Sequence, residues 1–183
     1  MKPVRVLLLP LALGVVAAAA TPHPRVSRES LAALERKFDR RIQSYDINDP
    51  FHLLGNTRGV YLADYGVVFT AEINLVAAAV VTPFRPPFTR EQIEQLRLKK
   101  LRRLEDLKRM MRDMMIECAV ALQGVSPGQK IAVGVSLFRF SWEDSRGLPR
   151  QILMEASRRA LLDFKAGKLQ PDELLARIRY TEY

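Results

Sequence analysis

The sequence predicts an α+β fold, with a small, mainly antiparallel sheet of three to four strands and helices packed on one face of it. Apolar residues recur at helical spacing over 27–44 and 89–122, and they alternate with period two over 67–76 and 130–140. No βαβ unit repeats along the chain, which argues against a doubly wound parallel sheet. The predicted order of elements is α-β-β-α-β-α-α, to which the last five residues can add an edge strand.

Local capping signals place the predicted helices. Ser27 can cap the first helix, because its hydroxyl accepts a hydrogen bond from an early backbone N–H. Thr89 and Gln92 form a capping-box pattern that opens the longest helix, which is expected to run to about 122. Pro171 stands at the first position of a short helix that ends near 178. A further helix is predicted over 148–166 from residues at steps of three and four: Leu153, Ala156, Ala160 and Phe164.

The strands are predicted from their alternation and from the turns that bound them. Segments 59–63 and 67–76 flank a turn at 64–66 and are expected to form a β-hairpin. Three prolines within 77–88 predict an extended crossover instead of regular structure. Both faces of 130–140 are apolar, which predicts a central strand. Small residues on its second face leave room for a helix to approach closely.

The N-terminal segment has the three-part pattern of a secretory signal peptide. Lys2 and Arg5 precede an uncharged run over 6–20, and small residues at Ala18 and Ala20 suit cleavage before Thr21. An uncharged run of this length is too short to span a bilayer, which takes about 20 apolar residues. We therefore predict a signal peptide over 1–20, a flexible tail over 21–26 and a single domain over 27–183, periplasmic or secreted.

Cysteine and methionine usage bounds the chemistry of that domain. The chain contains one cysteine, so it cannot form an internal disulfide. Cys118 lies in the apolar stripe of the longest helix and is expected to be a buried small hydrophobic residue. Met111 and Met114 share this stripe and are predicted core residues, whereas Met110 and Met115 lie at its edge, where they can touch a partner.

No motif for catalysis, metal binding or a cofactor is recognisable, and no cofactor is predicted. A single histidine without a second fixed ligand is weak evidence for a metal site. The residues therefore favour a non-enzymatic protein. A small enzyme is the alternative hypothesis, and it requires that at least two of four side chains meet in one pocket. These four are His52, Asp64, Glu72 and Glu143.

The positive charge is concentrated in one segment. Eight basic residues stand against two acids over 97–112, whereas the whole chain has 29 basic and 20 acidic residues. Such a run attracts an acidic partner in the cell envelope or an anionic surface. We predict a binding surface on this helix with an aromatic residue of the 141–147 loop. Its residues are Arg97, Lys99, Lys100, Arg102, Arg103, Arg109 and Trp142.

Two other interpretations of the same charges stay open. The run can be a solvated helix face that is laced by pairs such as Glu105 with Arg109. Alternatively, it can hold the protein at the surface of an anionic membrane. Nucleic acid is not an expected partner, because the chain is predicted to be exported and aromatic residues do not interleave with the cations.

Two segments, 59–76 (GVYLADYGVVFTAEINLV) and 135–148 (VSLFRFSWEDSRGL), resemble an uncharacterised family of exported bacterial proteins. The similarity covers most of the domain that follows the signal. It includes the hairpin with its Tyr-Gly turn, the proline-rich crossover, the long basic helix and the Ser-Trp-Glu-Asp loop. The resemblance implies export and a single domain, and it carries no site residues to this chain.

Overall fold

The computed structural model describes residues 26–77 and 88–183. The predicted signal peptide, nearly all of the predicted tail and most of the proline-rich crossover lie outside these residues. The described helices are α1 (Arg28–Gln43), α2 (Arg90–Ala121), α3 (Arg158–Lys165) and α4 (Pro171–Arg177). The described strands are β1 (His52–Leu53), β2 (Arg58–Leu62), β3 (Gly66–Asn74), β4 (Lys130–Leu137), β5 (Gln151–Ser157) and β6 (Arg179–Glu182).

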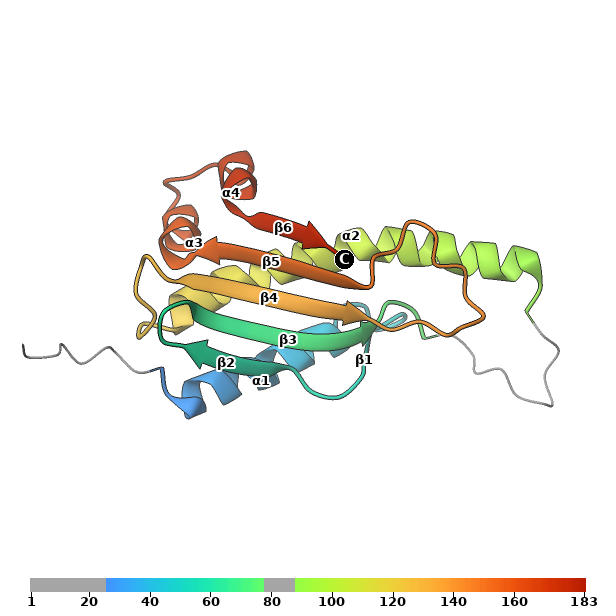
Figure 1. The fold of residues 1–183 in the computed structure, drawn as a ribbon, viewed down its shortest axis with the longest axis horizontal. Helices are drawn as coiled ribbons and strands as arrows, with labels where there is room; N and C mark the ends of the chain where they lie inside the picture. Colours follow the sequence, from blue (N-terminus) through green and yellow to red (C-terminus); the bar gives the residue numbers. More distant parts are fainter. Residues whose placement is uncertain (1–25, 78–87) are drawn as a thin grey trace, which may run out of the picture.

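The strands form one mixed sheet in the order β1-β3-β4-β5-β6, and β2 also pairs with β3 (Figure 1). The β3–β4 pair is parallel, because α2 carries the chain back along the sheet between them. The other pairs are antiparallel, including the predicted hairpin of β2 with β3 and the C-terminal edge strand β6. The α+β class and the central place of β4 are confirmed, but three to four strands is wrong: the described sheet has six.

The largest difference from the prediction is β5. We predicted a helix over 148–166, whereas residues 151–157 form a strand and only Arg158–Lys165 is helical. Ile152, Met154 and Ala156 alternate into the core, and the whole segment pairs with β4. The helical spacing of Leu153 with later residues was therefore coincidental, because Leu153 lies on the opposite face of the sheet from these three residues.

Helices α1 and α2 cover one face of the sheet (Figure 1). Ser27 caps α1 and the predicted capping box of Thr89 opens α2, so both predictions are confirmed. Phe38 of α1 meets Phe69 of β3 edge to face, with ring centroids 5.0 Å apart. Cys118 is buried as predicted.

The predicted contact of Met110 and Met115 with a partner is wrong. Both side chains are buried, as are Met111 and Met114, whose place in the core is confirmed. Helix α2 packs against α1 and α3 as well as against the sheet, so more than one of its sides faces the interior. Sequence spacing predicts a single apolar stripe and therefore underestimates the burial of such a helix.

The second face of the sheet is not covered by a helix in the described parts of the chain (Figure 1). Thr70 and Glu72 of β3 are exposed there, as predicted for Glu72. A shallow hollow of about 210 Å³ lies over Gly134, so the small residues of β4 do not serve a helix contact. Within 26–77 and 88–183, no helix combines the length and apolarity that crossing a bilayer requires.

The two edges of the sheet differ. At the β2 edge, the backbone N–H of Gly59 donates to Glu35 and its carbonyl accepts from Arg28, both on α1. The next outward N–H, that of Thr57, donates to Asp39 of the same helix. Side chains of α1 thus occupy backbone groups that an added strand would need. Strand β6, at the other edge, receives no such bond from a described side chain.

Candidate functional site

The cations of the basic segment are mostly paired within the domain. Six of the eight between residues 97 and 112 form ion pairs, and they do so largely with acids from outside the segment. The paired cations are Arg97, Lys99, Lys100, Arg103, Lys108 and Arg109. The acids from outside are Asp49, Glu94, Glu143, Asp144 and Glu182. Folding therefore offsets most of the charge excess that the sequence shows.

Two of the predicted binding residues are buried. Lys100 forms an ion pair with Glu143, and the two side chains are only 3% and 2% exposed. Arg103 donates from Nε to the Leu75 carbonyl at 2.7 Å, and its guanidinium lies 4.3 Å from the ring centre of Phe51. These contacts fasten α2 to the sheet and to the loop after β4, so neither cation is accessible to a partner.

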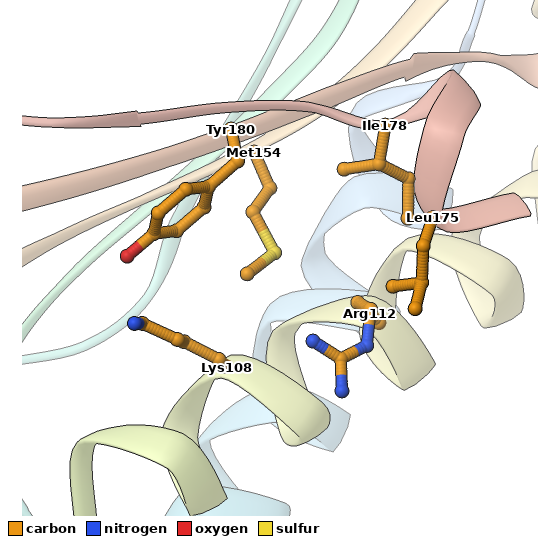
Figure 2. A pocket seen from close by; sticks show the side chains of 6 residues that line it. All are labelled: Lys108, Arg112, Met154, Leu175, Ile178 and Tyr180. Atoms are coloured by element: carbon orange, nitrogen blue, oxygen red, sulfur yellow. The ribbon is translucent and has the colours of Figure 1, made fainter. Parts of the chain in front are cut away.

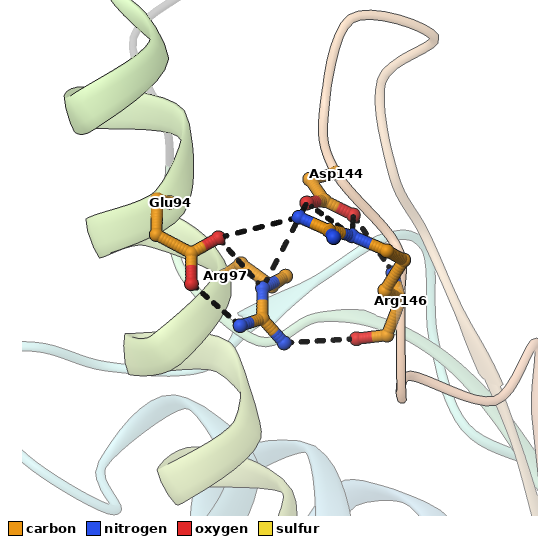
Figure 3. A network of polar contacts seen from close by, with 4 residues as sticks. All are labelled: Glu94, Arg97, Asp144 and Arg146. Atoms are coloured by element: carbon orange, nitrogen blue, oxygen red, sulfur yellow. Dashed lines mark hydrogen bonds and ion pairs between the residues drawn. The ribbon is translucent and has the colours of Figure 1, made fainter.

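Arg97 belongs to a network that holds the 138–150 loop against α2 (Figure 3). It donates to Glu94 at 2.9 Å and to the carbonyl of Arg146 at 3.3 Å. Arg146 in turn donates two kinds of hydrogen bond to the Asp144 carboxylate. The shortest one from its guanidinium measures 2.6 Å, and the one from its backbone N–H measures 3.0 Å. The Arg146 side chain is the main cause that lowers the pKa of Asp144 to about 2.

The lowered pKa of Asp144 predicts how this network responds to acid. The folded pKa of about 2 lies below the ordinary value of 3.8, so the stabilisation is fully present above about pH 4.5 and is lost as the pH falls from there towards 2. We expect the difference in unfolding free energy between the wild type and Asp144→Asn to be constant from pH 7 to about 4.5 and to shrink below that. Urea unfolding followed by the fluorescence of Trp142, the chain's only tryptophan, measures it. If the difference in unfolding free energy between the two proteins stays constant down to pH 2.5, the pKa of Asp144 is not lowered by folding and the prediction is wrong.

Trp142 lies in an aromatic stack in the part of the molecule that this network holds. Its ring is stacked between Phe88, at a centroid distance of 4.4 Å, and Phe140, at 5.7 Å. Phe138 meets Phe140 edge to face. Trp142 therefore packs the loop next to the beginning of α2, and its ring already contacts two other aromatic rings of the domain.

The last third of the basic segment is paired differently from the sequence hypothesis. Glu105 pairs with Lys108 at 2.8 Å and not with Arg109, which pairs with Asp106 instead. Arg109 remains exposed despite this contact, and Arg102 is exposed without an ion pair among the described residues. Of the seven predicted binding residues, Arg102 and Arg109 are the most accessible to an external anion.

The structure does not bring the four candidate catalytic residues together. Glu143 is committed to Lys100, and Asp64 lies in the turn between β2 and β3. His52 and Glu72 are exposed on neighbouring strands, and no hydrogen bond joins them. In the described part of the chain, no three His, Cys, Asp or Glu side chains gather where they could hold a metal ion.

A different site lies further along α2, in a groove between α2, α4 and β6 (Figure 2). The groove has a volume of about 250 Å³. Its apolar walls are Met154 of β5 together with Leu175, Ile178 and Tyr180, and two cations of α2 complete it: Lys108 and Arg112. Leu175 is 48% and Tyr180 40% exposed, so both side chains leave apolar surface in contact with water.

The two cations of the groove differ in their ion pairing. Lys108 pairs with Glu105 and with Glu182, and its Nζ lies 5.0 Å from the centre of the Tyr180 ring. Burial alone would lower the pKa of Lys108, but hydrogen bonds with Glu105, Tyr180 and Glu182 raise it overall. Arg112 lines the same groove and forms no ion pair or hydrogen bond with a described residue. The groove therefore combines an apolar surface with the guanidinium of Arg112, which has no ion-pair partner among the described residues.

The sequence alone did not predict this groove. Arg112 was counted in the basic run, but nothing local distinguishes it from its paired neighbours. The apolar wall comes from residues 154–180, a segment in which β5 was mistaken for helix. The signal that could have found it is the cluster Leu175, Ile178 and Tyr180, since these apolar residues lie in and just after a short helix that already supplies the core residue Leu174. Comparisons with known protein families, with curated proteins and with solved structures found no significant match.

Proposed function

We propose that this domain is a binding protein whose α2–α4–β6 groove takes a ligand with an anionic group next to a short apolar group. The basic helix α2 remains the binding element, but the proposed binding site lies around Arg112 instead of residues 97–109. As the signal pattern of residues 1–20 predicts, the domain would act outside the cytoplasm, in the cell envelope or after secretion.

The observation that carries the proposal is the uncommitted guanidinium of Arg112 beside apolar side chains. Most cations of the segment already have a carboxylate partner inside the domain, and Arg102, the other one that forms no ion pair with a described residue, does not line this groove. A hydrogen bond to a charged group contributes about 1.5–3 kcal/mol. Burial of Leu175 and Tyr180 beneath a ligand adds an apolar contribution that grows with the area removed from water.

The size of the groove limits the ligand. Pockets for drug-sized molecules measure about 300–1,000 Å³, and this one is somewhat smaller at about 250 Å³. It suits one apolar side chain or a short acyl chain with a carboxylate at the rim. The groove is partly open to solvent, so a longer molecule can continue beyond it.

The test is a titration with three small probes followed by NMR: hexanoate, hexanol and acetate. We expect hexanoate to bind more tightly than either of the others, because only hexanoate offers both an anion and an apolar chain. Arg112→Gln should weaken hexanoate binding about tenfold or more, the equivalent of one charge-assisted hydrogen bond. Hexanol binding should not change.

Arg102→Gln is the matched control, because it removes an unpaired cation of the same helix outside the groove. It should leave hexanoate binding within about twofold of the wild type, since exposed charges at a distance are screened. Equal losses in the two variants would show a diffuse charge effect, and the groove would not be the site. Equal affinities for hexanoate and hexanol would also refute the proposal.

A further inference from the structure

Among the described strands, β6 pairs only with β5 and forms the edge of the sheet on the side of the groove. The Tyr183 N–H donates to the Gln151 carbonyl at 3.0 Å, and the Tyr183 carbonyl accepts from Arg150 at 2.6 Å. Because antiparallel strands alternate their hydrogen bonding, the backbone groups of Tyr180 and Glu182 point away from β5. This edge therefore offers two N–H and two carbonyl groups to another strand.

The groove lies between this edge and α2 (Figure 2). Lys108 contacts Tyr180 and Glu182, whereas Arg112, one turn further along α2, lies towards Leu175 and Ile178. The helix and the strand thus run in opposite directions along the groove. A separation of four residues on a helix is about 6 Å, close to the two-residue repeat of about 6.6 Å on one face of a strand.

We propose that the ligand of the groove is an extended peptide segment that adds to β6 as a further strand. Alternate side chains of such a strand point to the helix side of the sheet. One apolar side chain would fill the space between Ile178, Leu175 and Tyr180, and an acidic side chain two positions along would bind Arg112. The backbone of the segment would bond to Tyr180 and Glu182. This inference rests on the proposed function, since it names the class of ligand for the same groove.

Charge favours an acidic peptide over a second copy of this chain. Arg112 lines the groove and Arg177 is exposed in the last turn of α4, whereas Arg179 already pairs with Glu155, and the Glu182 carboxylate of the strand is held by Lys108. Two copies would bring these cations together, whereas an acidic segment would neutralise them. The opposite edge is a poor alternative, because Arg28 and Glu35 of α1 occupy the outward backbone groups of Gly59.

The experiment uses a capped heptapeptide, Ser-Thr-Leu-Thr-Glu-Thr-Ser, and its counterpart with Leu and Glu exchanged, because an added strand can run in either direction. We expect one of them to bind the purified protein at least tenfold more tightly than hexanoate, and Arg112→Gln to weaken it at least tenfold. Amide exchange of Tyr180 and Glu182 should slow at least tenfold on binding. The N–H of Tyr61, at the opposite edge, is the control and should not change.

Two N-methylated forms of the better peptide separate strand addition from simple side-chain binding. One carries the methyl group on Leu and the other on the central Thr. Neighbouring residues of a strand direct their N–H groups to opposite edges, so only one of the two forms should lose binding. Equal affinity of both methylated forms would show that the backbone does not pair with β6 and would overturn the inference.

The remaining outcomes distinguish this inference from the proposed function. If hexanoate binds through Arg112 while the peptides bind no better and leave Tyr180 and Glu182 unprotected, strand addition is wrong and the groove remains a site for small anions. If neither probe binds, both proposals fail. If sedimentation shows a dimer whose Tyr180 and Glu182 amides are protected without peptide, the occupant is a second copy, and the peptide proposal is overturned.

Discussion

Replacing Lys100 by methionine is expected to lower the free energy of unfolding by about 3–5 kcal/mol. The side chains of Lys100 and Glu143 form an ion pair that is almost inaccessible to water. Removal of the ammonium leaves a carboxylate buried without its counterion, and the desolvation of that carboxylate is no longer offset. The loop that contains Glu143 should then detach from α2. Urea denaturation followed by Trp142 fluorescence measures the loss.

The matched control is the double variant Lys100→Met with Glu143→Met. Since replacement of both members of a buried pair by apolar residues of similar size is often neutral or stabilising, the double variant should regain most of the lost stability. It should come within about 1 kcal/mol of the wild type or exceed it. If the double variant is less stable than the single one, the pair is not acting as a buried ion pair and the prediction is wrong.

Gly66→Ala is expected to cost about 2–4 kcal/mol, from backbone strain and overpacking together. Gly66 begins β3 with a φ of 131°, a conformation that residues with a side chain rarely adopt. An added Cβ would lie 2.0 Å from the carbonyl oxygen of Lys130, so the parallel pairing of β3 with β4 would have to open at that end.

Gly128→Ala is the control for this prediction. A Cβ at Gly128 would meet no atom within 4 Å, and its φ is not positive. It should therefore leave stability unchanged or raise it slightly through the lower entropy of the unfolded chain. Thermal or urea unfolding of the two variants and the wild type measures both changes in stability. A similar effect at both positions would contradict the close approach at Gly66.

Features with local causes were predicted correctly. The caps at Ser27 and Thr89 depend on atoms within three residues, and the alternation along 67–76 depends on one strand. Strand β5 could not be predicted, because its pairing with β4 overrides a spacing that suits a helix equally well. The two-residue strand β1 exists only through its pairing with Ile73 and Asn74 of β3, so the sequence around it reads as a loop.

The binding site, like strand β5, could not be predicted because it depends on contacts between distant segments. The sequence places eight cations within residues 97–112 of one helix but does not show that Asp49, Glu143 and Glu182 come from distant segments to pair with them. Arg102 and Arg112, which form no ion pair with a described residue, can be recognised as unpaired only when these partners are known. The apolar wall of the groove was hidden for a similar reason, because it is assembled from β5, α4 and β6 and belongs to no single periodic segment.

The central claim is that Arg112, among the cations of α2, is the one held ready for an external anion beside an apolar surface. The most direct measurement is the arginine Nε–Hε NMR spectrum during a titration with hexanoate. We predict that the Arg112 resonance shifts and sharpens in step with binding, while those of Arg97 and Arg103, which are committed to internal partners, stay in place. Equal small shifts of all exposed arginines, or a shift of Arg102 in place of Arg112, would contradict the claim.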